Sequence, residues 1–158
     1  MVDAEQADDY VRRLHQLVDQ LVAPIVAVNA PRLACRVGCA GCCTDGLTVA
    51  GVEAERIRRD FGHVLEEAPA AEGCAFLDEA GACRVYAARP YVCRTQGLPL
   101  RWAEAGVEHR DICPLNEAGP PIEGLPVEAC WTIGPVEARL LAVSTGERVA
   151  LRSLFIRR

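Results

Sequence analysis

The chain has 158 residues, of which 51% are hydrophobic, enough for a single domain with its own core. Its formal net charge of −5 argues against a nucleic-acid partner, because a phosphate backbone attracts basic surfaces. All 17 basic residues are arginines, a bias typical of a GC-rich bacterial genome, and the lack of lysine excludes Schiff-base and P-loop chemistry.

An amphipathic helix is predicted over residues 3–29, within an N-terminal unit at 1–30. Its apolar residues recur three and four positions apart and so share one face: Val11, Leu14, Val18, Leu21, Ile25 and Val28. Pro24 is expected to kink or split this helix. We expect the apolar face to pack on the rest of the chain, with a dimerising coiled coil as the alternative.

Residues 31–158 are predicted to form the second unit, a cysteine-cluster domain with a C-terminal helix. It begins with a glycine-rich loop at 35–46, followed by a possible short strand at 47–49. A helix should follow over 50–61, with Gly62 placed to cap its carboxyl end.

A β-hairpin is predicted over residues 74–86. If Leu77 pairs with Ala82, then Cys74 and Cys83 lie on the same face of the hairpin and can reach one site.

The remaining elements are one short helix, a second hairpin and a last helix. Pro90 should occupy the first position of the short helix, with Cys93 in its first turn. The second hairpin is expected over 98–112, with its turn at 103–106, and the last helix over 134–146. These elements predict an α+β fold, a small metal-centred domain with short β-hairpins and several helices.

The start of the chain is acidic and lacks the pattern of a secretory signal peptide. The longest apolar stretch, residues 21–28, is too short to cross a bilayer. We therefore expect a cytoplasmic protein without a membrane partner. In that compartment thiols stay reduced, so clustered cysteines indicate a metal site or a redox centre.

Nine cysteines are just under 6% of the chain, too few for a small disulfide scaffold. Eight of them are predicted metal ligands: Cys35, Cys39, Cys42, Cys43, Cys74, Cys83, Cys93 and Cys113. They could form two sites of four thiolates, or one site with spare thiols. Cys42 and Cys43 are adjacent, so either they serve two metals, or one ligates while the other packs or takes part in redox chemistry. Cys130 is interpreted as a buried structural thiol.

Three arginines flank the later thiols and are predicted to bind the cofactor, because guanidinium groups offset the negative charge of a multi-thiolate site: Arg84, Arg89 and Arg94. The histidines His15, His63 and His109 lack ligand spacing to a cysteine and are interpreted as structural or surface residues. His15 is expected at the boundary of the first helix's apolar face.

The run Cys39-Ala-Gly-Cys42-Cys43, with the later hairpin and its Arg89-Pro90-x-x-Cys93-Arg94 sequence, resembles the YkgJ-type CxxCxxCC cysteine-cluster family over about residues 35–114. Three residues separate Cys35 from Cys39, where the family pattern has two. The family is described as zinc- or iron-chelating, or as containing iron–sulfur clusters. The resemblance implies metal binding and no particular reaction.

Scattered thiolates favour a 4Fe–4S cluster, whereas zinc prefers paired Cys-x2-Cys knuckles, of which only Cys39 and Cys42 form one. Zinc and mononuclear iron are the alternatives. Three functions stay open: a non-enzymatic protein for electron transfer or metal handling, with a redox or maturation protein as partner; an oxidoreductase or group-transfer enzyme; and a structural zinc module. An enzyme would need a pocket beside the cluster, with groups such as Arg94, Gln96 and His109.

Overall fold

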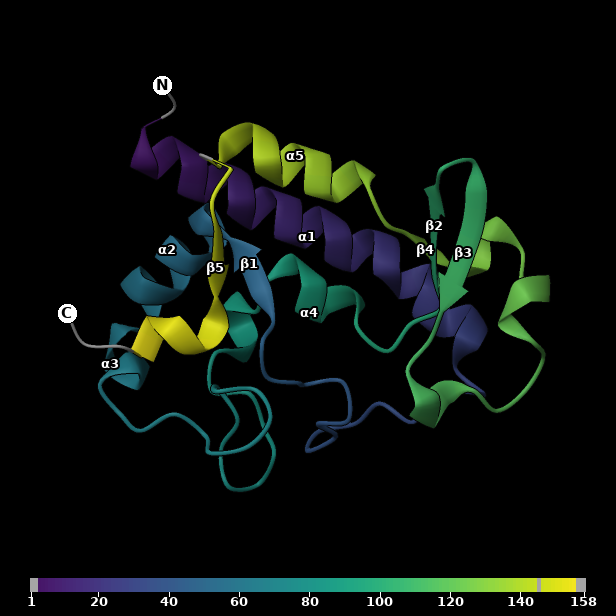
Figure 1. Ribbon diagram of the computed structural model, residues 1–158, viewed down its shortest axis with the longest axis horizontal. Helices are drawn as coiled ribbons and strands as arrows, with labels where there is room; N and C mark the ends of the chain where they lie inside the picture. Colours follow the sequence, from purple (N-terminus) through teal and green to yellow (C-terminus); the bar gives the residue numbers. More distant parts are fainter. Residues whose placement is uncertain (1–2, 145, 156–158) are drawn as a thin grey trace.

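The computed structural model describes residues 3–144 and 146–155 (Figure 1). Helix α1 (Ala4–Asn29) runs along the molecule, and helix α5 (Pro135–Val143) lies beside it. Helices α2 (Gly51–Asp60) and α3 (Gly62–Leu65) stand at one end with a two-stranded sheet, and a three-stranded sheet stands at the other. The fold is α+β, as predicted.

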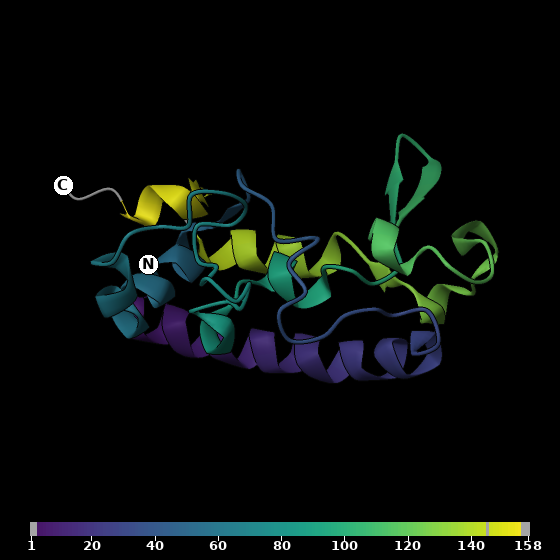
Figure 2. The ribbon, with the colours of Figure 1, turned by 90° about the horizontal axis from the view of Figure 1, so that it is seen from below.

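The two sheets are built from short strands. Strands β1 (Thr48–Ala50) and β5 (Arg148–Ala150) pair antiparallel. In the other sheet, β2 (Leu100–Glu104) pairs antiparallel with β3 (Val107–Asp111) and parallel with β4 (Trp131–Thr132). The hairpin of β2 and β3 projects from the body of the molecule (Figure 2).

The remaining helices are single turns or little more. Helix α4 covers Tyr91–Thr95, and the 3-10 turns η1 to η5 cover Tyr86–Ala88, Pro114–Asn116, Ile122–Gly124, Val127–Ala129 and Leu151–Phe155. Within the described residues, no helix is both long and apolar enough to cross a membrane.

Helix α1 begins at the Asp3 cap, whose carboxylate accepts a hydrogen bond from the Gln6 amide at 2.9 Å. Pro24 does not split the helix, one of the two predicted outcomes, since the helix continues through it to Asn29. Pro24 and the residue four positions before it lie on the exposed side, where water can reach the carbonyl that proline leaves unpaired.

Two apolar residues predicted for the buried face of α1 lie toward solvent instead. Val11 and Val18 are fully buried, but Leu21 is 49% exposed and Val28 is 62% exposed. A seven-residue repeat drifts by about 20° per heptad around a straight helix, so the series from Leu14 through Leu21 to Val28 turns progressively toward solvent.

The buried residues divide into two apolar clusters. The first joins α1 to α4, α5 and β4 through side chains that include Val18, Tyr91, Trp131 and Leu140. The second lies under α2 and η5: Val49, Ala54, Ile57, Val64, Cys74, Phe76, Val85, Leu151 and Leu154. Cys74 belongs to this second cluster, so one predicted ligand is anchored in a hydrophobic core.

The structure corrects the predicted ends of two helices. Gly62 does not cap α2; Phe61 does, and Gly62 opens α3 instead. The last helix ends at Val143 rather than at Gly146, because Ser144 already has extended backbone geometry.

The structure also corrects both hairpins. Residues 74–86 form one isolated bridge, between Leu77 and Cys83 rather than Leu77 and Ala82. The Asp78 carboxylate accepts hydrogen bonds from the amides of residues 80 and 82, at 2.9 and 2.8 Å, which widens the turn by one residue. The second hairpin turns on Ala105 and Gly106 alone, both with positive φ, so its turn is two residues shorter than predicted.

Candidate metal centre

The cysteine loop at 35–46 is built from tight turns. The Cys39 amide donates to the Arg36 carbonyl at 2.9 Å, and the Cys43 amide donates to the Ala40 carbonyl at 3.0 Å. Gly38 has a φ of +85°, and a Cβ added to Gly81 would stand 3.0 Å from the Gly38 carbonyl oxygen. The loop therefore lies directly against the turn of residues 78–81.

Four thiols from three segments affect one another's pKa values, and we call Cys43, Cys74, Cys83 and Cys93 the inner thiols. The Cys74 amide donates to the Cys43 carbonyl at 2.9 Å, joining the loop to residues 74–86. Burial, together with the smaller effect of negative charge on Cys74 and Cys83, raises the pKa of Cys93 to about 12. Charge on Cys74 likewise raises the pKa of Cys83, after the larger effect of burial.

The adjacent thiols Cys42 and Cys43 behave differently from each other. A hydrogen bond between their side chains lowers the pKa of Cys42 to about 6 and raises that of Cys43. Charge on Cys74 and Cys93 also raises the pKa of Cys43. Within the pair, it is therefore Cys43 whose pKa responds to the other inner thiols.

Cys35 lies at the other end of the loop, beside the segment that follows Cys113. Its sulfur accepts a hydrogen bond from Asn116 Nδ2 at 3.4 Å, and a Cβ added to Gly97 would stand 3.1 Å from it. Asn116 is 1% exposed and also bonds the Ala34 amide at 2.7 Å and the Gly97 carbonyl at 2.8 Å. The sequence did not predict a role for Asn116, because no pattern in the neighbouring residues indicates that its amide side chain would be buried.

The chemistry of these side chains fits a thiophilic metal, since thiolates are ligands for zinc and for iron–sulfur clusters. The eight thiols all lie in the described residues as free cysteines. Among residues 3–144 and 146–155, however, no three His, Cys, Asp or Glu side chains are already arranged to hold an ion. Binding would therefore require the sulfur atoms to close around it.

The three predicted cofactor-binding arginines have different surroundings. Arg84 donates to the backbone carbonyls of residues 68, 75 and 76 and pairs with Glu67 at 3.0 Å, so it braces the turn of residues 74–86. Arg94 pairs with Asp19 of α1 at 2.6 Å and donates to the carbonyls of residues 87 and 89. Both side chains hold backbone in place.

The charge of Arg89 acts on two inner thiols, Cys83 and Cys93, and the charge of Arg84 also acts on Cys83. The Arg89 guanidinium stacks 4.0 Å from the centre of the Tyr86 ring, and its buried Nε has no hydrogen-bond partner in the described structure. Its positive charge favours the thiolate form of Cys83 and of Cys93.

Helix α4, which carries Cys93, is fixed by a buried carboxylate that sequence reasoning missed. Glu53 is 3% exposed, and its Oε1 accepts the Tyr91 amide and His15 Nε2, both at 2.7 Å. Arg56 Nη1 donates to His15 Nδ1 at 2.7 Å. His15 is 2% exposed, so its predicted boundary position is wrong: it lies inside the contact between α1 and α2, where partners on the other helix satisfy both ring nitrogens.

The other singled-out residues lie elsewhere. His109 stacks on Trp102 in the projecting hairpin, with ring centres 5.5 Å apart, and His63 stacks on Phe61 at 6.1 Å. Cys130 is 4% exposed and accepts a hydrogen bond from Arg110 Nη1 at 3.6 Å.

The part of the chain that contains the eight predicted ligands matches a known sequence family. The model of the CxxCxxCC family, described as "Putative zinc- or iron-chelating domain", matches residues 34–114. The chain belongs to this family. All eight predicted ligands lie inside the matched range, and Cys130 lies outside it. No curated protein and no solved structure matched the chain.

Proposed function

We propose that this CxxCxxCC protein binds metal in two thiolate groups and serves electron transfer or metal handling. The observation that carries the proposal is the mutual electrostatic influence of the inner thiols, which come from a loop, a turn and a helix up to 50 positions apart. Apolar packing accounts for the burial of Cys74, whereas Cys43 and Cys83 pack against the same cluster and are only partly buried. A cation is what makes four neighbouring thiolates stable together.

The adjacent Cys42 and Cys43 divide between the two groups in this proposal. Cys43 joins the inner thiols, since charge on Cys74 and Cys93 acts on it. The outer thiols are then Cys35, Cys39, Cys42 and Cys113. The contact of Cys35 with Asn116, three positions after Cys113, supports placing the two ends of this group together.

An iron–sulfur cluster of the 4Fe–4S type is our preferred occupant of the inner thiols, with zinc or mononuclear iron as the alternative. Its ligands would be scattered along the chain, and Arg89 would offset the negative charge of the bound group. When bound, such a cluster supplies one-electron chemistry, whereas zinc supplies a structural cross-link.

A protein partner of the redox or maturation class would meet the outer thiols first. Cys35 is exposed, Val37 beside it is 93% exposed, and Leu115 is 56% exposed. Leu115 lies against the loop, since a Cβ added to Gly41 would stand 2.8 Å from its Cδ1. We place this exchange in a reducing cytoplasm, where the thiols stay available.

The deciding experiment is anaerobic purification followed by absorption spectroscopy and analysis of iron, sulfide and zinc. A brown protein that contains iron and acid-labile sulfide supports the cluster. A colourless protein with stoichiometric zinc and no iron overturns the cluster while keeping metal binding. Protein that retains neither metal after reconstitution with iron and sulfide, or with zinc, overturns the whole proposal.

A further inference from the structure

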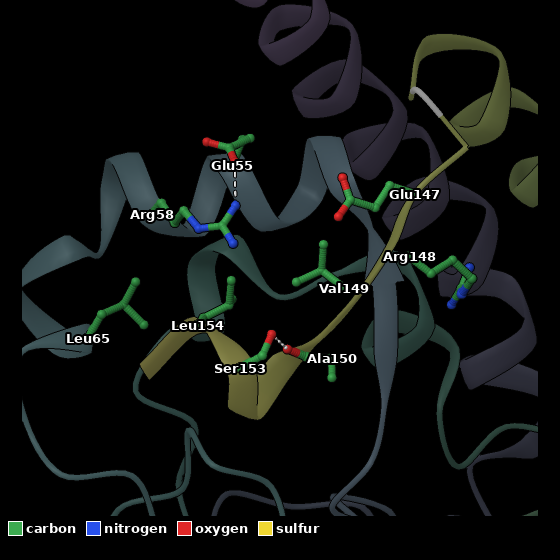
Figure 3. Close-up of a pocket in the computed structure, with 9 residues that line it drawn as sticks. All are labelled: Glu55, Arg58, Leu65, Glu147, Arg148, Val149, Ala150, Ser153 and Leu154. Carbon is green, nitrogen blue, oxygen red and sulfur yellow. Dashed lines mark hydrogen bonds and ion pairs between the residues drawn. The ribbon is translucent and has the colours of Figure 1, made fainter. Parts of the chain in front are cut away.

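One hollow lies between α2, α3, β5 and η5 and has a volume of about 690 Å³ (Figure 3). It is open to solvent. Figure 3 shows Arg58 directed at Glu55 and the Ser153 hydroxyl directed at the Ala150 carbonyl, and both pairs form hydrogen bonds. These polar groups recognise one another, so they do not mark a ligand site.

A smaller and more enclosed pocket of about 120 Å³ lies behind helix α4. Its apolar wall comes from β1, α4, α5 and the segment just before α5, and includes Val49, Val92, Ile133, Leu140 and Leu141. Val92, Thr95 and Gln96 of α4 and its cap face it, and Cys93 is not among its lining residues. The short helix therefore separates this pocket from the inner thiols.

The size and the lining of this pocket suit a small organic molecule. A dry cavity of about 150 Å³ is known to hold benzene, so this volume matches roughly one six-membered ring. A mostly apolar wall with a few converging polar groups is also the usual composition of a ligand site.

Two carboxylates line the pocket, and Glu137 has more free acceptor positions than Glu53. Glu53 already accepts hydrogen bonds from Tyr91, His15 and Ala50. Glu137 accepts the Gly134 amide at 2.6 Å and the Tyr91 hydroxyl. A carboxylate offers about four acceptor positions, so Glu137 can accept a further donor.

The charge at the pocket disfavours an anionic guest. Arg148 lines it, but its Nε and Nη2 donate to the side chain and the carbonyl of Thr48. Because Glu53 and Glu137 both line the pocket against one arginine, its charge favours a guest that donates a hydrogen bond.

We propose that this pocket binds a small, largely apolar molecule, about one six-membered ring in size, which donates one O–H or N–H hydrogen bond to Glu137. The site lies outside the thiol groups and requires no bound metal. Its guest would be held against Gln96, whose Nε2 donates to the Cys42 carbonyl at 3.3 Å, so the pocket and the cysteine loop share a structural element.

The test uses phenol and toluene, two probes of equal size of which only phenol has a hydrogen-bond donor. Both are titrated into the full-length ¹⁵N-labelled protein, with the metal content of each sample recorded. We expect amide shifts that centre on Thr95, Gln96 and Leu140, with phenol binding at least fivefold more tightly than toluene. In Glu137→Gln, which retains an acceptor for the Gly134 amide, this preference should fall to less than twofold.

Val92→Phe fills the pocket and should abolish the shifts, while Val127→Phe, the same substitution at a half-exposed residue that does not line the pocket, should retain them. Leu141→Phe is a second blocking variant, since Leu141 is 49% exposed and tolerates bulk without loss of core packing. Shifts that persist in both blocking variants, or no saturable shifts at α4, overturn the site. Equal binding of phenol and toluene overturns the role of Glu137. None of these variants changes a cysteine, so the result is independent of the metal proposal.

Discussion

The residue that distinguishes the two thiol groups is Cys43. Its neighbour Cys42 has the lower pKa, but the charges of Cys74 and Cys93 act on Cys43. The sequence left open which of the adjacent pair ligates, because two side chains that diverge from one loop can each reach a site. Our proposal divides the pair, with Cys43 among the inner thiols and Cys42 among the outer thiols.

Cys43→Ser should lose most of the metal bound by the inner thiols, which is about half of the total if both groups are filled. Cys42→Ser should lose the outer share instead, and Cys130→Ser should keep the full content. Elemental analysis of the three variants, prepared side by side, measures this. If Cys43→Ser and Cys42→Ser retain wild-type content, the proposed ligand sets are wrong.

Arg89→Gln should weaken metal binding by about tenfold, the low end of the usual effect of groups around a metal site. Without the guanidinium, the pKa of Cys83 and of Cys93 rises, so protons compete better with the metal. The pH of half-loading should therefore move upward. Chelator competition between pH 6 and pH 9 measures the shift.

Arg36→Gln is the matched control for this prediction, because Arg36 lies in the cysteine loop but is exposed, with one long bond of 3.4 Å to the Ala34 carbonyl. An equal effect of the two substitutions would assign the loss to general charge rather than to Arg89.

At the scale of elements, the buried group of His15, Glu53 and Arg56 joins α1, α2 and α4. Tyr91 is the first residue of α4, and its amide donates to Glu53. Glu53 therefore fixes the start of the helix that carries Cys93. The apolar periodicity of α1 indicated a packed helix. It could not indicate that a histidine would be buried at the contact, since the partners that satisfy its ring lie 38 and 41 positions away.

Burial lowers the pKa of His15 below its usual value near 6.5, and the charge of Glu53 only partly offsets this effect. The unfolded chain therefore binds a proton more readily than the folded one. The stability supplied by neutral His15 is complete above pH 6.5 and is lost as the pH falls toward the folded pKa, at about 1.4 kcal/mol per unit of lowering.

Urea unfolding of metal-free protein at pH 7.5 and pH 5 should show this loss in the wild type and a smaller loss in His15→Gln. His63→Gln should behave like the wild type, because His63 is exposed. A wild-type free energy of unfolding that does not fall between these pH values contradicts the prediction.

At the scale of the whole molecule, the two apolar clusters have different relations to the thiols. The cluster around α1 and α5 contains no cysteine, whereas the cluster under α2 contains Cys74 and has Cys43 and Cys83 packed against it. The cysteine loop and the turn of residues 78–81 meet on the side of the molecule away from α5 (Figure 1). Metal should therefore stabilise this side more than the helical side.

Removal of metal with a chelator should increase amide hydrogen exchange at residues 35–46 and 74–86 by tenfold or more, while α1 near Val18 changes by less than threefold. Exchange followed by mass spectrometry measures both regions in one sample. Uniform loss of protection would mean that the metal supports the entire fold, as it does in small zinc-dependent domains.

The sequence by itself determined the ligand candidates, the long first helix and the α+β class, since these depend on residue type and on spacing along the chain. The tertiary structure decided the rest. It distinguished Arg89 from Arg84 and Arg94, buried His15, and placed Glu53 and Asn116 beside the cysteine segments. Each of these outcomes depends on partners far away in the sequence, and a local pattern contains no information about which distant group will satisfy a buried charge or amide.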